Sequence, residues 1–203
     1  MLSIRLICVG KLKEQFYTDA ANEYIKRLSG YCKLEIIEVP EYRLPPGSAV
    51  VNSKPGIRNS ETKNNFSIKT QRSAEITPES SQDYVSREPV QQDSRIVSAL
   101  NKERAVIEAK IPEGSVCVAL CIEGREMDSP DLSGFLNDCA IRGLSRLCFI
   151  IGGSFGLHED VKKRAAVKLS MSKMTFPHNL ARVMLLEQLY RAFKIIEGGN
   201  YHK

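Results

Sequence analysis

Three glycines follow an apolar segment late in the chain and could form a ligand-binding turn. Gly152, Gly153 and Gly156 come directly after LCFII (147–151), with GGxxG spacing. Glycine at the carboxyl end of a strand permits positive φ and lets a ligand approach the backbone, at the edge where open α/β sheets bind ligands. The alternative is a tight strand-to-helix turn that binds nothing. Because GGxxG is a short motif, the segments that follow it must decide between the two interpretations.

A loop rich in methionine and hydroxyl groups comes next, LSMSKMTF (169–176), directly before Pro177. Proline is common in the first turn of a helix, where free backbone N–H groups can meet a carboxylate or a carbonyl group. Met171 and Met174 would supply a soft apolar wall suited to an adenine ring or a thioether. The alternative is an edge strand and turn with core methionines.

The final predicted helix, 177–197, is apolar around most of its circumference. Its narrow polar stripe includes Glu187 and Arg191, whose i, i+4 spacing is typical of a surface ion pair. One face of a sheet cannot cover the remaining surface, so we predict a homodimer through this helix. Arg182 falls on the apolar side. We expect it either to reach solvent from the helix start or to face an anionic ligand or a partner carboxylate.

The chain ends in a short aromatic and basic tail, Tyr201, His202 and Lys203, two glycines beyond this helix. A stacking ring, an imidazole and a cation are what an arm that contacts RNA bases needs. The alternative is a frayed chain end.

Five strand-like segments alternate with five helical ones and must position these motifs. This alternation predicts an α/β fold with a mostly parallel five-stranded sheet and helices on both faces. Ser129, followed by Pro130, is predicted to be the N-cap of the third helix. The predicted strands are 3–9, 33–39, 115–122, 146–151 and 169–174, and the other predicted helices are 16–28, 94–110, 160–167 and 177–197.

A polar stretch interrupts this pattern between about 45 and 93, where Ser, Asn, Gln, Thr and Pro dominate. We predict a single domain, 1–203, with this stretch as an insertion outside the compact body. It is either a solvated disordered loop or a segment that folds on contact with a partner.

Composition sets further expectations. The 203 residues have no apolar run near the roughly 18 residues of a membrane span and no signal peptide, so we expect a soluble, cytoplasmic protein with no membrane association. The formal charge of +5 is compatible with a polyanionic partner but does not establish one. The six cysteines form no CxxC pair and the three histidines no HxxxH, so we predict buried, reduced thiols and no metal.

Taken together, IIGGSFGL, LSMSKMTFPH, ARVMLLEQLYRAF and the terminal YHK resemble the SPOUT-class ribosomal RNA large subunit methyltransferase H family. ICVGKLK and EIIEVP match its opening strands, so the likeness flanks the polar stretch, which is longer than the family's usual connection. The resemblance implies a C-terminal trefoil knot, a homodimer, and S-adenosyl-L-methionine bound inside the knot. It also implies methylation of N3 of a pseudouridine in 23S ribosomal RNA (rRNA) on assembled ribosomes.

The resemblance assigns the cofactor site to residues that largely coincide with the motifs above. Leu120, at the end of its strand, would otherwise be assigned to the core. The cofactor residues implied are Leu120, Gly152, Met171, Ser172, Lys173, Met174, Thr175 and Phe176.

The implied reaction is an in-line displacement that moves a methyl group from the sulfonium to N3. The imide N–H is mildly acidic, so the enzyme needs positioning and a group that accepts the proton. We assign catalytic roles to His202, Tyr201 and Arg182, with His202 as the proton acceptor because imidazole titrates near neutrality. RNA contacts are assigned to His178, Arg191 and Lys203. The alternatives are a SPOUT methyltransferase of another RNA, such as transfer RNA (tRNA), and a non-catalytic ribosome-assembly or RNA-binding factor.

Overall fold

The computed structural model describes residues 1–44 and 93–199. Most of the predicted insertion and the tail residues Tyr201, His202 and Lys203 therefore lie outside the described residues. Asp93, at the end of that insertion, belongs to the folded body. It caps the next helix by accepting the backbone N–H of Arg95 at 2.9 Å.

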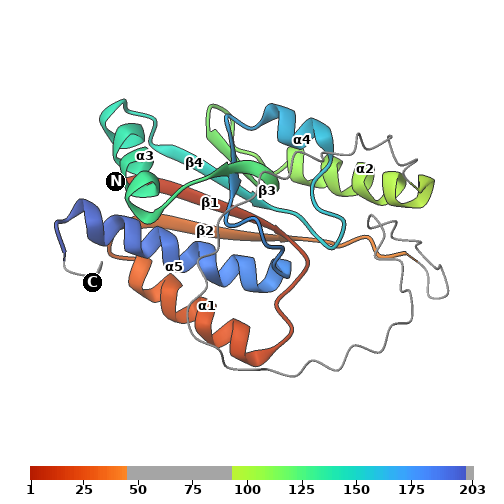
Figure 1. The fold of residues 1–203 in the computed structure, drawn as a ribbon, viewed down its shortest axis with the longest axis horizontal. Coiled ribbons are helices and arrows are strands. Elements are labelled where there is room, and N and C mark those ends of the chain that lie inside the picture. The colour runs from red at the N-terminus through yellow and green to blue at the C-terminus, as the bar shows by residue number, and fades with distance from the viewer. Residues whose placement is uncertain (45–92, 200–203) are drawn as a thin grey trace, which may run out of the picture.

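Within the described residues, the five strands form one sheet in which every pair of neighbours is parallel (Figure 1). The order across the sheet is β2-β1-β4-β3-β5. This confirms the predicted α/β class and the parallel sheet. The strands are β1 (Leu2–Val9), β2 (Cys32–Val39), β3 (Val116–Glu126), β4 (Arg146–Ile151) and β5 (Val167–Ser170).

Helices cover both faces of the sheet (Figure 1). On one face α5 lies between α1 and α3 and packs against both, and α2 and α4 lie on the opposite face. The helices are α1 (Gln15–Leu28), α2 (Ser94–Glu108), α3 (Ser129–Ile141), α4 (Glu159–Arg164) and α5 (His178–Ile196).

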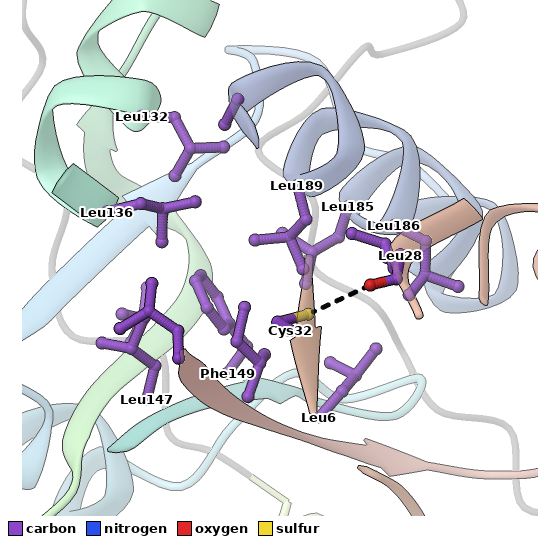
Figure 2. Packing of buried hydrophobic residues seen from close by; sticks show 14 of the residues in the cluster. Leu6, Leu28, Cys32, Leu132, Leu136, Leu147, Phe149, Leu185, Leu186 and Leu189 are labelled. Atoms are coloured by element: carbon purple, nitrogen blue, oxygen red, sulfur yellow. Dashed lines mark hydrogen bonds between the residues drawn. The ribbon is translucent and has the colours of Figure 1, made fainter. Parts of the chain in front are cut away.

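The leucines of α5 supply much of the core on that face. Figure 2 shows Leu185 and Leu189 on the side of Phe149 of β4 and Leu186 beside Leu28 of α1, and all of these side chains are fully buried. Because α1 and α3 cover the two sides of α5, neighbours within the same chain cover much of its apolar circumference. Val183 and Tyr190 stay half-buried and Ile196 exposed, so the homodimer through this helix stays a prediction.

β3 is longer than predicted because Gly124 does not end it. The strand continues to Glu126, with a register shift between Leu120 and Arg125 where it pairs with β5. A Cβ built on Gly124 would lie 2.6 Å from the backbone carbon of Leu169. The glycine thus allows two backbones to approach closely, which is one reason for glycine inside a strand.

Three other boundaries differ from the predictions. The predicted helix 160–167 and strand 169–174 are displaced, since α4 stops at Arg164 and β5 spans Val167–Ser170. The N-cap of α3 is Asp128, whose carboxylate accepts the backbone N–H of Asp131 at 2.7 Å. Ser129 instead donates its hydroxyl to Gln188 of α5 at 2.8 Å.

All six cysteines are free, and all except the half-buried Cys121 are buried, as predicted. Among residues 1–44 and 93–199, no helix is long and apolar enough to cross a membrane. Over the same ranges, no three His, Cys, Asp or Glu side chains gather as a metal site would require.

Candidate functional site

A pocket of about 960 Å³ opens at the carboxyl ends of β3, β4 and β5. Its walls come from the middle of β3, the glycine turn after β4, the loop after β5 and the first turn of α5, with one residue each from α2 and α4. The structure brings together all the predicted cofactor residues except one. Lining this pocket are Leu120, Gly152, Met171, Ser172, Met174, Thr175 and Phe176.

Lys173 lies at a smaller hollow next to the main pocket. That hollow has a volume of about 510 Å³ and is also lined by Glu126 and Asp128. Met171 and Ser172 line both spaces. Lys173 is therefore beside the main pocket rather than in its wall.

Close backbone packing explains the glycine turn. A Cβ on Gly152 would overlap the carbonyl oxygen of Gly156 and lie 2.5 Å from its carbonyl carbon. A Cβ on Gly153 would lie 2.8 Å from a methyl carbon of Val9, at the end of β1. Gly156 itself has φ +79°, a conformation that favours glycine. The turn is thus both a tight structural turn and a wall of the pocket.

Local hydrogen bonds shape the methionine loop. The Ser170 hydroxyl donates to the carbonyl of Ser172 at 2.9 Å, and the Ser172 hydroxyl accepts the backbone N–H of Met174 at 3.0 Å. These turns replace the strand predicted here. Met171 packs against the core, whereas Met174 is 70% exposed at the pocket. Met171 thus belongs both to the core and to the pocket lining, and the role of the methionines as a wall for a ligand stays a prediction.

Arg182 is buried in a network at the ends of β1 and β2. It is 2% exposed, and its guanidinium donates to the Glu38 carboxylate at 2.6 Å and to the carbonyl oxygen of Gly10 at 2.8 Å. The structure thus confirms the expectation that Arg182 faces a carboxylate, which is Glu38 of the same chain. The other expectation, that Arg182 reaches solvent, is wrong. The Arg182 side chain does not line the pocket.

His178 lies at the pocket wall and Arg191 does not. His178 begins α5 and packs over Gly10, with Nε2 3.3 Å from the position of a Cβ on that glycine. Gly10 is thus held between His178 and the Arg182 network. Arg191 pairs with Glu187 at 2.6 Å, which confirms the i, i+4 ion pair.

Two charged pocket residues were not predicted from the sequence. Glu123, in the outer part of β3, and Lys162, in α4, form an ion pair at 2.5 Å. Lys162 also contacts Glu159 at 2.9 Å. Glu123 could have been found from the sequence, because it is the first charged residue after the apolar part of β3. No motif near Lys162 marks it as a pocket residue.

Glu41 was also missed, although it holds the glycine turn from outside the pocket. Its side chain is 7% exposed and accepts hydrogen bonds from the Ser154 hydroxyl at 2.5 Å and from Arg43 at 2.9 Å. Burial alone would raise the pKa of Glu41, but these hydrogen bonds outweigh burial and hold the pKa below its ordinary value.

We expect Glu41→Gln to lower the free energy of unfolding by about 1–2 kcal/mol at pH 7. Because the folded pKa lies below the unfolded one, the carboxylate stabilises the fold above its ordinary pKa. That stabilisation is lost as the pH falls through the folded pKa. Urea unfolding at neutral and acidic pH should show wild type and variant converging in acid. The control is Glu23→Gln, which removes an ion pair with Arg27 on the surface, where the Glu23 side chain is 52% exposed. It should change the free energy of unfolding by at most about 0.5 kcal/mol. A pH-independent deficit in Glu41→Gln would contradict the assignment.

The comparisons with known proteins span the whole chain. The family model described as "Predicted SPOUT methyltransferase" matches residues 2–86 and 64–202. The chain is 39% identical over 202 residues to ribosomal RNA large subunit methyltransferase H 1 of Clostridium perfringens strain SM101, with all of both chains covered. Over the same length and coverage, it is 40% identical to ribosomal RNA large subunit methyltransferase H of Clostridium botulinum strain Langeland. The protein therefore belongs to the SPOUT methyltransferase family, with the ribosomal RNA large subunit methyltransferase H proteins as its relatives.

Proposed function

We propose that the protein methylates N3 of a pseudouridine in 23S rRNA, with S-adenosyl-L-methionine as methyl donor and the assembled ribosome as substrate. Family membership supports a methyltransferase, and the names of its relatives support a large-subunit rRNA substrate. The observation that carries the proposal is the pocket, which gathers the glycine turn and the methionine loop in one wall.

The pocket residues fit this cofactor. Its volume of about 960 Å³ lies in the range of small-molecule sites. Leu120, Met171 and Phe176 offer apolar surface for an adenine ring. Gly152 contributes bare backbone to the pocket wall, and a side chain there would overlap the backbone of Gly156. When bound, the cofactor supplies an activated methyl group on its sulfonium and leaves as a neutral thioether.

The chain's own residues would position the base and receive its proton. His178, at the pocket wall, would contact an incoming nucleotide; it packs against Gly10, whose carbonyl oxygen accepts a hydrogen bond from Arg182. We now assign Arg182 a positioning role in place of direct catalysis. Arg191 and Lys203 remain proposed RNA contacts. Tyr201 and His202 remain the proposed base-contacting residues, with His202 accepting the N3 proton.

The family resemblance also supports three architectural proposals. The segment around the glycine turn and the methionine loop forms a trefoil knot, the protein works as a cytoplasmic homodimer, and 1–203 is one domain with a polar insertion. The half-buried Val183 and Tyr190 and the exposed Ile196 of α5 are the surface that a second copy would cover.

A methyl-transfer assay tests the function. The full-length protein and labelled S-adenosyl-L-methionine are incubated with ribosomes from a strain that lacks it, with free 23S rRNA and with tRNA, and the labelled nucleotide is mapped. We expect label on one pseudouridine of assembled ribosomes. Label on tRNA, or on free 23S rRNA alone, would contradict the substrate, and no label on any RNA would favour a non-catalytic RNA-binding factor.

A further inference from the structure

The main pocket has one charged region in a largely neutral wall. Among the described residues that line it, Glu123 and Lys162 are the only Asp, Glu, Lys or Arg side chains. They lie on different elements, β3 and α4, and meet at 2.5 Å. The fold therefore presents one negative and one positive group side by side to whatever occupies the pocket.

Both groups are held in their charged forms. The Lys162 side chain is 15% exposed and Nζ contacts Glu123 and Glu159. Burial alone would lower the pKa of Lys162, but the two carboxylates outweigh burial and raise it. Burial alone would raise the pKa of Glu123, but its hydrogen bonds and the positive charges of Lys162 and Lys168 together outweigh burial and lower the pKa.

We propose, resting on the proposed function, that Glu123 and Lys162 bind the amino-acid end of S-adenosyl-L-methionine. Lys162 contacts the α-carboxylate and Glu123 contacts the α-ammonium. A zwitterion presents the same two charges as the pair, so each side chain exchanges part of its contact with the other for a contact with the ligand.

The two charges of the pair, rather than the net charge around it, favour the amino-acid end. Lys168 also acts on Glu123, so Glu123, Glu159, Lys162 and Lys168 together carry two negative and two positive charges. The neutral ribose would need only an acceptor such as Glu123, and would leave Lys162 without a function in the pocket. The pocket wall carries both a negative group, Glu123, and a positive group, Lys162, which favours the amino-acid end over the ribose as the ligand group bound there.

Calorimetric titration of the full-length protein with three ligands tests this. S-adenosyl-L-methionine and S-adenosylhomocysteine carry the amino-acid end, and 5′-methylthioadenosine lacks it. We expect Lys162→Met and Glu123→Gln each to weaken binding of the first two roughly tenfold or more, with methylthioadenosine binding unchanged. Unchanged methylthioadenosine binding also shows that the variant pocket is folded.

A matched control lies on the same helix. Asp160, on α4 and outside the pocket wall, forms a 2.5 Å ion pair with Arg104 of α2. Asp160→Asn breaks this pair and should leave all three affinities at wild-type values. Equal losses for methylthioadenosine would place the pair at the ribose and overturn the proposal, as would unchanged affinities for all three ligands. A wild-type protein that binds none of the three would instead remove the proposed function itself.

Discussion

Gly152→Ala is expected to cost more than about 3 kcal/mol of folding stability and to abolish cofactor binding. The added Cβ would overlap the carbonyl oxygen of Gly156 and lie 3.0 Å from the backbone nitrogen of Leu157. Both are backbone atoms of the same tight turn, so relief requires the turn to open rather than a side chain to rotate. Because this turn is a wall of the pocket, strain and loss of the site should appear together. Urea unfolding and calorimetry with S-adenosyl-L-methionine measure the two effects.

Gly134→Ala is the matched control, because this glycine lies within α3 and a Cβ there meets nothing within 4 Å. In a helix interior, alanine should raise stability by about 0.5–1 kcal/mol. If Gly152→Ala kept wild-type stability and affinity, the turn would have room that the structure does not provide.

Arg182→Met should lower the free energy of unfolding by about 2–4 kcal/mol, mainly through the loss of a buried charge network. The substitution leaves the Glu38 carboxylate without its cation and the carbonyl of Gly10 without its donor. Glu38 is 35% exposed and can regain water, so the loss should fall below that of a fully buried pair. Urea unfolding of wild type and variant measures the loss of stability, and the methyl-transfer assay measures activity of the same proteins.

The two assays separate positioning from direct RNA contact at Arg182. Normal stability with lost activity would return this residue to the catalytic role assigned from the sequence. Arg125→Met removes an exposed pair with Asp131, whose side chains are 73% and 50% exposed. It should change stability by no more than about 0.5 kcal/mol.

The sequence predicted the strands and most helices because apolar periodicity is a local property. The predicted end of β3 was wrong at Gly124, because glycine usually indicates the end of a strand. The close approach of the Leu169 backbone, which explains this glycine, is not visible in the sequence. The apolar circumference of α5 shows a similar limit. Counting apolar positions shows how much surface must be covered, but not how much of it α1 and α3 of the same chain cover.

Most of the pocket was predictable because its walls are short contiguous motifs carried by the family resemblance. What was missed depends on partners far away in sequence. The partner of Arg182 is Glu38, 144 residues away, and Glu41, which was not predicted, reaches Ser154, 113 residues away. Glu123 and Lys162 are ordinary charged residues until the sheet brings β3 beside α4. Periodicity contains no information about such pairs.

The strand order also bears on when the protein can fold. β1 is an interior strand of the sheet, yet its neighbour β4 begins only at Arg146, which pairs with Ser3. Contacts between segments so distant in sequence form slowly, because the chain entropy of closing the loop is lost before the pairing stabilises it. During translation, β1 therefore exposes an unpaired edge until most of the chain has been made. The pocket completes later still, since its last wall is the start of α5. A nascent chain of this protein would acquire its ligand site only after the first turn of α5 has been made.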